Sequence, residues 1–183
     1  LEAAREHGVR KVIFSSSGGA GYGEQDYFPA DEKHPLRPVS PYGVAKVSVE
    51  LYLQYYRVQY GLEYTALRYS NVYGPRQDPH GEAGVVAIFC TRLLKGHTAF
   101  VNGDGLQTRD YVYVGDVVRA NLEALSRGDG LSVNIGTGVE TDVNTLFRTL
   151  RDLSGSRQEE IHGPAMPGEQ RRSVIEIGMA FNE

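Results

Sequence analysis

The sequence predicts an α/β fold built around a mostly parallel sheet. Short apolar runs that are typical of strands alternate with helical patterns of ten or more residues. Such helices are the crossover connections that parallel strands need. With 183 residues, of which 40% are hydrophobic and 23% charged, the chain has enough apolar mass for a domain core.

The first forty residues predict the end of a helix, one strand and a long loop. Residues 1–8 are typical of final helical turns that stop at Gly8. The apolar run 11–15 predicts a buried strand, and a glycine- and serine-rich loop over 16–23 leads into a polar segment over 24–40. Because neither an initiator methionine nor an N-cap precedes the helix end, we expect the chain to begin inside an element of a longer protein.

A long amphipathic helix is predicted over residues 41–60. Ser40 suits the N-cap and Pro41 the first helical position. Gly61 suits the stop. Apolar side chains recur every three or four positions, at Val44, Val47, Leu51, Tyr55 and Val58.

The rest of the chain continues the alternation. A strand over 64–69 ends where Gly74 and Pro75 break the pattern. The elements expected after it are a helix over 85–95, strands over 99–101 and 110–114, a helix over 116–126, a strand over 132–135 and a helix over 142–153. The tail after Ser154 is rich in proline and glycine, and its pattern does not assign it to an element.

Composition excludes several classes of function. The net charge is −4 and no Lys/Arg run occurs, so nucleic acid is not an expected partner. No apolar stretch approaches the ~20 residues of a membrane span. Cys90, the single cysteine, lies in an apolar run and is expected to be a buried small side chain, which suits a reducing cytoplasm. The histidines lack metal-ligand spacing, so no metal is expected.

Tyr42 and Lys46 are the strongest chemical feature. Four residues apart on a helix, they share one face. A free tyrosine is a poor base at pH 7 because its pKa is about 10. An ammonium ~4 Å away, at an effective dielectric near 20, stabilises a phenolate by ~4 kcal/mol, which is enough to make it a base for a hydroxyl proton. From this pair alone, an ordinary polar helix face remains the alternative.

Ser15, Ser16 and Ser17 follow a predicted buried strand. The carboxyl ends of strands are where open α/β sheets bind ligands. Small hydroxyl side chains there can bond a substrate oxygen, although serines also suit a simple turn.

Several motifs occur in a fixed order: Phe14-Ser-Ser-Ser17, Ser40-Pro-Tyr42-Gly-Val-Ala-Lys46, Leu67-Arg-Tyr-Ser-Asn71-Val-Tyr-Gly-Pro75, Thr108-Arg-Asp-Tyr-Val-Tyr-Val-Gly-Asp116 and Asn134-Ile-Gly-Thr-Gly138. Their order resembles that of the extended short-chain dehydrogenase/reductase family, the NAD-dependent epimerases and dehydratases, and within it most resembles the UDP-glucose 4-epimerases.

The resemblance implies a partial Rossmann-like, doubly wound parallel sheet with a small α/β substrate-binding lobe. Residues 1–74 would be the carboxy-terminal part of the NAD-binding domain. Residues 75–183 would be mainly the nucleotide-sugar-binding lobe, with a return to the Rossmann sheet near 110–136. The family's glycine-rich NAD-binding loop would lie upstream of Leu1, so we expect this segment alone to be inactive.

The resemblance also implies residue roles. The catalytic residues would be Ser17, Tyr42 and Lys46. The NAD contacts would come from Ser15, Tyr42, Lys46, Tyr69 and Ser70. The contacts to a UDP-sugar would come from Ser17, Tyr42, Asn71, Val85, Val86, Phe100, Val101, Asn102, Arg109, Glu169 and Ser173. A homodimer would form through the helix 41–60.

Two departures from the family's pattern bear on the substrate. Met166-Pro-Gly-Glu169 stands where the family usually has Arg-x-Gly-Asp, so one diphosphate-binding cation is absent while a carboxylate is kept. Ser173 stands where a large tyrosine restricts the sugar pocket in the family, so an N-acetyl group would have room.

Three alternatives compete with a nucleotide-sugar 4-epimerase. Dehydratases of this family carry an acid and a base directly after the serine or threonine of the triad, and decarboxylases carry a glutamate there. This chain has Gly18 and Gly19 instead, which favours transient oxidation at the sugar C4 over elimination. A non-catalytic NAD-binding module is the third alternative. Such modules often lose the Tyr or Lys that this chain keeps.

Overall fold

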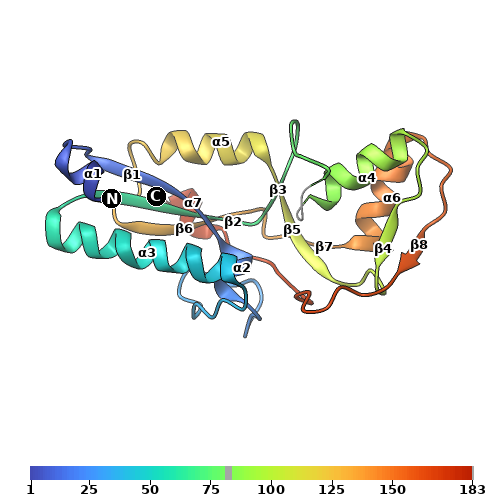
Figure 1. The fold of residues 1–183 in the computed structure, drawn as a ribbon, viewed down its shortest axis with the longest axis horizontal. Helices are drawn as coiled ribbons and strands as arrows, with labels where there is room; N and C mark the ends of the chain where they lie inside the picture. Colours follow the sequence, from blue (N-terminus) through green and yellow to red (C-terminus); the bar gives the residue numbers. More distant parts are fainter. Residues whose placement is uncertain (81–83, 183) are drawn as a thin grey trace.

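The computed structural model describes residues 1–80 and 84–182, arranged as three small sheets along an elongated molecule (Figure 1). One end holds the sheet β1-β2-β6, the middle holds β3-β5-β7, and the far end holds β4-β8 with the helices α4 and α6. The predicted α/β class is confirmed. Residues 81–83 and 183 of the predicted lobe lie outside the described residues.

The first sheet is entirely parallel. It pairs β1 (Lys11–Ser17) with β2 (Glu63–Tyr69), and β2 with β6 (Leu131–Ile135). Helix α3 (Pro41–Tyr60) covers one face and α5 (Val114–Glu123) the other (Figure 1). Because all three strands run the same way, their carboxyl ends meet at one edge, which faces the middle of the molecule.

Helix α3 forms for the local reasons that the sequence indicates. The Ser40 hydroxyl accepts a hydrogen bond from the Gly43 amide at 3.1 Å, and Pro41 occupies the first turn. Gly61 ends the helix in the left-handed conformation, with φ of 71°. Gly43 has a second role: a Cβ there would lie 2.4 Å from the Ala20 carbonyl oxygen, so only glycine lets α3 approach the chain after β1 this closely.

A buried polar network fastens α3 to the first sheet. The Arg68 guanidinium donates to both carboxylate oxygens of Glu50, to Oε2 at 2.6 Å and to Oε1 at 3.1 Å, and each side chain is only 7% exposed. The hydroxyls of Ser16 and Ser132 donate to the same carboxylate. Arg68 also donates to the Tyr22 hydroxyl, at 3.1 Å. Each of the three strands therefore contributes one side chain that is hydrogen-bonded to Glu50: Ser16 from β1, Arg68 from β2 and Ser132 from β6.

The other two sheets build the rest of the molecule. In the middle, β3 (Asn71–Tyr73) pairs parallel with β5 (Thr108–Tyr113), and β5 pairs antiparallel with β7 (Glu140–Asp142). At the far end, β4 (Phe100–Asn102) and β8 (Ile161–Gly163) pair in parallel beside α4 (Val85–Leu94) and α6 (Val143–Ser154). These two helices and β4 share a core that includes Phe89, Val101 and Phe147.

Several expectations about local structure were wrong. The predicted loop over 16–23 contains the end of β1 and a short helix, α2 (Gly18–Tyr22). Residues 140–142 form a strand, β7, that was not expected, and the tail after Ser154, which the sequence pattern left unassigned, contains β8 and α7 (Gly178–Asn182). The helix end expected over residues 1–8 is present as α1, which spans Glu2–Glu6. These elements are too short to have a periodicity of their own. Their partners stabilise them: Tyr22 of α2 is fully buried and its hydroxyl donates to Asn134 at 2.7 Å.

The segment near 110–136 is divided between two sheets. Helix α5 and strand β6 lie with β1 and β2, whereas β5 belongs to the middle sheet. The proposed division of the chain at residue 74 stays a prediction. Within the described ranges, no helix is both long enough and apolar enough to cross a membrane.

Candidate active site

Tyr42 and Lys46 lie together at the carboxyl end of β1. The Lys46 ammonium is 5.4 Å from the centre of the Tyr42 ring and 5.0 Å from that of Phe14. It donates to the Ser15 carbonyl oxygen at 2.7 Å. Tyr42, the second residue of α3, is 57% exposed. The cation is thus tied to the end of the strand while the phenol remains accessible to a ligand.

Ser17 ends β1 at the same edge, and the tail of the chain passes over the residues that follow it. A Cβ on Gly19 would lie 2.8 Å from the Ser173 hydroxyl oxygen. Ser173 is buried in this position, since only 5% of it is exposed. Ser173, which stands at the position predicted to control sugar size, therefore lies against α2, the helix that begins directly after Ser17.

Two further predicted cofactor residues lie at the end of β2. The Tyr69 and Ser15 hydroxyls are 3.2 Å apart. The Ser70 hydroxyl donates to Asp110 at 3.4 Å. Asp110, which is only 1% exposed, also accepts from the amides of Thr137 and Gly138, at 2.9 and 3.0 Å. The sequence alone gave Asp110 no role, although it lies in one of the ordered motifs and its partners lie in another.

A second cluster forms where the tail meets β5. Arg109 Nη2 lies 3.4 Å from Glu169 Oε1, and Arg109 Nη1 donates to the Thr108 carbonyl oxygen at 2.7 Å. Gln107, which is buried, donates from Nε2 to Glu169 Oε2 at 3.4 Å and to the Asn102 carbonyl oxygen at 3.1 Å. Arg109 and Glu169, which lie far apart in the sequence, are thus paired.

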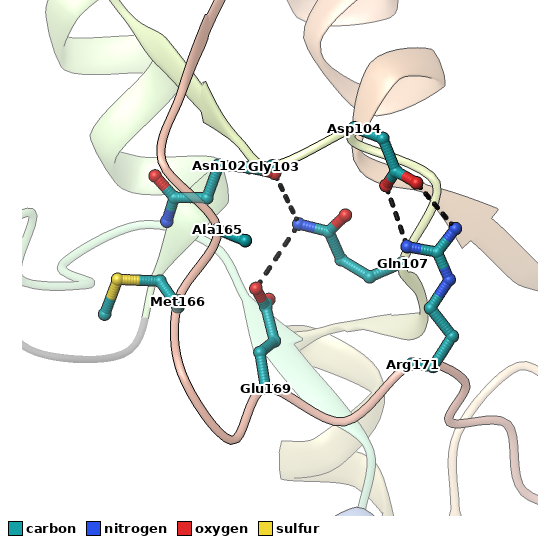
Figure 2. Close-up of a pocket in the computed structure, with 8 residues that line it drawn as sticks. All are labelled: Asn102, Gly103, Asp104, Gln107, Ala165, Met166, Glu169 and Arg171. Atoms are coloured by element: carbon teal, nitrogen blue, oxygen red, sulfur yellow. Dashed lines mark hydrogen bonds and ion pairs between the residues drawn. The ribbon is translucent and has the colours of Figure 1, made fainter.

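Figure 2 shows the pocket beside this cluster, with a volume of about 230 Å³. The lining residues are Asn102, Gly103, Asp104, Gln107, Ala165, Met166, Glu169 and Arg171. Two of them, Asn102 and Glu169, were predicted. Asp104 and Arg171 were not, and they form a two-bond ion pair at 2.7 and 2.9 Å. Hydrogen bonds from Arg171 lower the pKa of the Asp104 carboxyl to about 2.

The remaining predicted substrate residues differ in accessibility. Asn71 and Phe100 are exposed, and Val85 and Val86 are half-buried at the start of α4. Val101 corrects one expectation, because its side chain is completely buried in the core beside Phe89 and Phe147. Alternate residues of a strand face opposite sides, so the exposure of Phe100 and Asn102 requires Val101 to point inward. Only its backbone could contact a ligand.

His162 bonds the backbone of Gly103, which lines the pocket, and its protonation should change the thermal stability of the protein. Hydrogen bonds with the Gly103 carbonyl oxygen, at 2.7 Å, and with Glu160, at 3.1 Å, raise the pKa of His162 above 6.5. A raised folded-state pKa adds stability that is complete below the unfolded value and is lost as the pH rises through the folded value. At about pH 5.5 we expect the wild type to have a higher melting temperature than His162→Gln, and by about pH 9 we expect the two melting temperatures to be equal. A difference in melting temperature that does not depend on pH would contradict this.

In the part of the chain that the structure describes, no group of three or more His, Cys, Asp or Glu side chains could hold a metal ion.

Comparison with known proteins identifies the family. The profile of the NAD dependent epimerase/dehydratase family matches residues 1–136. A UDP-glucose 4-epimerase of Mycolicibacterium smegmatis is 49% identical over 177 residues, which is 96% of this chain and 56% of that protein. The human dTDP-D-glucose 4,6-dehydratase is less similar, at 37% identity over 154 residues, which is 84% of this chain and 43% of that protein.

Solved structures agree. The UDP-glucose 4-epimerase of Thermotoga maritima with UDP-glucose superposes with a TM-score of 0.97 at 52% identity, over 99% of this chain and 59% of that one. A UDP-N-acetylglucosamine 4-epimerase of Methanobrevibacter ruminantium, in complex with UDP-N-acetylmuramic acid, has a TM-score of 0.94 at 36% identity, over 98% and 58% of the two chains. The chain therefore spans under two thirds of the length of these relatives. On this similarity of sequence and structure, the chain belongs to the NAD dependent epimerase/dehydratase family.

Proposed function

We propose that this chain is the catalytic and sugar-binding part of an NAD-dependent nucleotide-sugar 4-epimerase whose substrate is a UDP-sugar. One observation carries the proposal: Lys46 joins Tyr42 to the carboxyl end of β1, while the positions directly after Ser17 are glycines. The site has a group that can exchange a hydroxyl proton, but no acid at that place to expel water.

In this mechanism Tyr42 is the base. Its phenolate removes the proton from the sugar C4 hydroxyl and later returns it. The Lys46 ammonium stabilises the phenolate by charge. Ser17 donates a hydrogen bond to the same sugar oxygen. Because the Ser15 carbonyl oxygen holds Lys46 at 2.7 Å, the cation is in place before the substrate binds.

The donor set at this edge suits the nicotinamide half of NAD. An ammonium and several hydroxyls, from Lys46, Tyr42, Ser15 and Tyr69, converge at the carboxyl end of a parallel sheet, where such sheets bind dinucleotides. When bound, NAD would supply the redox chemistry as a reversible hydride carrier. Lys46 and Tyr42 would hold the ribose beside it.

Inversion requires the oxidised sugar to turn while its nucleotide stays bound. Arg109 is the cation for the diphosphate, because a planar guanidinium matches phosphate geometry. In the structure Glu169 neutralises Arg109 at 3.4 Å, so the diphosphate must displace this carboxylate. Met166 brings no cation to the neighbouring pocket, and Arg171, which lines that pocket, is already paired with Asp104. We therefore expect diphosphate binding to depend strongly on Arg109.

The alternatives within the family fit less well. A dehydratase or a decarboxylase would need an acidic side chain where Gly18 and Gly19 stand. A Cβ on Gly18 would already lie 3.1 Å from the Ile175 side chain, so an acid there would be crowded. A non-catalytic NAD-binding module would not need Tyr42 and Lys46 together.

Ser173 leads to a prediction about sugar size. Because it is small and lies against Gly19, we expect turnover of both UDP-glucose and UDP-N-acetylglucosamine. The variant Ser173→Tyr should lose most of its activity on the acetylated sugar while keeping activity on UDP-glucose. Steady-state kinetics with both substrates measure this. Rejection of UDP-N-acetylglucosamine by the wild type would count against the proposal.

A homodimer through α3 is part of the proposal. The helix exposes a set of large apolar side chains, which in a monomer would face water. They are Leu51 at 61%, Tyr52 at 62%, Tyr55 at 49% and Val58 at 79% exposed. Sedimentation of the chain and of Leu51→Glu tests this, with a monomeric wild type as the contradicting result. The cytoplasmic location expected from the single cysteine remains a prediction.

The activity is tested in an extended chain, in which a glycine-rich NAD-binding unit is fused ahead of Leu1. Such a chain should interconvert UDP-galactose and UDP-glucose with NAD, and the 183-residue chain alone should not. Release of a dehydrated or decarboxylated sugar by the extended chain would overturn the proposal. Epimerisation by the unextended chain would refute the need for the upstream unit.

A further inference from the structure

Asn121 of α5 fixes the direction of a hydrogen-bond chain that reaches the candidate active site. Its Nδ2 atom lies 2.7 Å from the Val117 carbonyl oxygen and 2.7 Å from the Tyr69 hydroxyl oxygen. A carbonyl oxygen can only accept, so the atom between these two partners must be the amide nitrogen. Both of its hydrogens are then used, and the Tyr69 oxygen is an acceptor.

The bond from Asn121 leaves the Tyr69 hydrogen available for the next bond. Because the Tyr69 oxygen accepts from Asn121, its own hydrogen is free for the Ser15 hydroxyl oxygen, 3.2 Å away. When Tyr69 donates this bond, Ser15 accepts it and keeps its own hydrogen for another acceptor. Among residues 1–80 and 84–182, the Ser15 hydroxyl has no other hydrogen-bond partner, and Ser15 is exposed.

Ser15 also holds the lysine. Its carbonyl oxygen accepts from Lys46 at 2.7 Å, so one residue joins the α5 side of the sheet to the α3 side. Figure 1 shows these two helices on opposite faces of the sheet β1-β2-β6. Ser15 therefore contacts Tyr69 through its hydroxyl and Lys46 through its carbonyl oxygen, at the edge where the proposed cofactor binds.

We propose that Asn121 is a positioning residue, which orients the Tyr69 and Ser15 hydroxyls so that Ser15 donates a hydrogen bond to an oxygen at the nicotinamide end of the cofactor. This role rests on the proposed function. Asn121 itself touches neither substrate nor cofactor in this arrangement, since it acts through Tyr69. This role also explains why an amide suits position 121, because a group that only accepts hydrogen bonds would reverse the direction of the bonds between Tyr69 and Ser15.

Asn121→Asp makes this reversal with almost no change of size. The carboxylate would accept from Tyr69, Ser15 would then have to donate to Tyr69, and no hydrogen would remain for the cofactor. In the chain extended by its NAD-binding unit, we expect NADH, titrated by its fluorescence, to bind about 2- to 10-fold more weakly, the range of one hydrogen bond. Ser15→Ala should weaken NADH binding by a similar factor.

The double variant separates positioning from a structural effect. If Asn121 acts through Ser15, then Asn121→Asp should cause no additional loss of NADH affinity in the Ser15→Ala background. Destabilisation of α5 by the half-buried carboxylate would instead lower the melting temperature equally in both backgrounds. Ser15→Ala changes one exposed side chain, so it should fold even if Asn121→Asp does not.

The outcomes distinguish the two proposals. A wild-type extended chain that fails to bind NADH overturns the proposed function and this role with it. If the wild type binds NADH, then unchanged affinity in Asn121→Asp or in Ser15→Ala overturns the role of Asn121 and leaves the proposed function standing. A loss in Asn121→Asp that persists undiminished in the Ser15→Ala background also overturns that role alone.

Discussion

Replacement of Tyr42 by phenylalanine is expected to lower kcat for epimerisation by about 10²- to 10⁴-fold, the usual contribution of a positioned acid-base group. The variant removes the hydroxyl that exchanges the C4 proton. It keeps the ring, whose centre lies 5.4 Å from the Lys46 ammonium, so substrate binding should change little. Steady-state kinetics of the extended chain, with kcat and KM determined separately, make the measurement.

Tyr52→Phe is the matched control for this variant. Tyr52 lies on the same helix and is 62% exposed, and no hydrogen bond of its hydroxyl is found within the described residues. It should retain wild-type kcat. A Tyr42→Phe enzyme with more than about a tenth of wild-type kcat would show that another group exchanges the proton, because acid-base catalysis contributes at least about 10²-fold.

Replacement of Arg68 by methionine should lower the free energy of unfolding by about 3–5 kcal/mol, the cost of leaving a buried charge without its partner. Burial alone lowers the pKa of the Arg68 guanidinium, but hydrogen bonds and charge from Glu50 and Tyr22 outweigh it and the net pKa is raised. Once Arg68 is gone, Glu50 would keep hydroxyl donors from Ser16 and Ser132 but no cation. Urea unfolding followed by circular dichroism measures the change.

The chain contains its own control for this prediction. Arg57 and Glu63 also join α3 to β2, with the Arg57 Nε atom 2.7 Å from the Glu63 carboxylate, but their side chains are 43% and 35% exposed. Arg57→Met should therefore cost no more than about 1 kcal/mol. The double variant Glu50→Leu/Arg68→Met should be less destabilised than Arg68→Met, since it buries no charge. Equal losses for Arg57→Met and Arg68→Met would contradict the argument.

The buried network and the active site depend on the same geometry. Glu50 lies one turn beyond Lys46 on α3, and Ser16 lies between Ser15 and Ser17 on β1. The bonds that Glu50 makes to Ser16 and Arg68 therefore hold the end of β1 against the start of α3. Loss of Arg68 should reduce activity as well as stability, because it loosens the contact that places Lys46 beside Ser15.

Local signals in the sequence determined the parts of the molecule that depend on near neighbours. The cap at Ser40, the proline after it and the glycine at position 61 mark both ends of α3. Helical geometry then places Tyr42 and Lys46 on one face. The glycines at positions 18 and 19 are likewise visible without a structure, and with the order of the motifs they favour an epimerase over a dehydratase.

Only the tertiary structure decided which distant residues meet. It placed Ser173 against Gly19, paired Glu169 with Arg109, buried Val101 and joined Asn121 to Ser15 through Tyr69. It also gave α2, β7 and β8 their partners. Such contacts follow from strand order and from the path of the tail, which hydrophobic periodicity does not encode. Periodicity and caps act within a few residues of one another, whereas these contacts join distant parts of the chain through the packing of separate sheets.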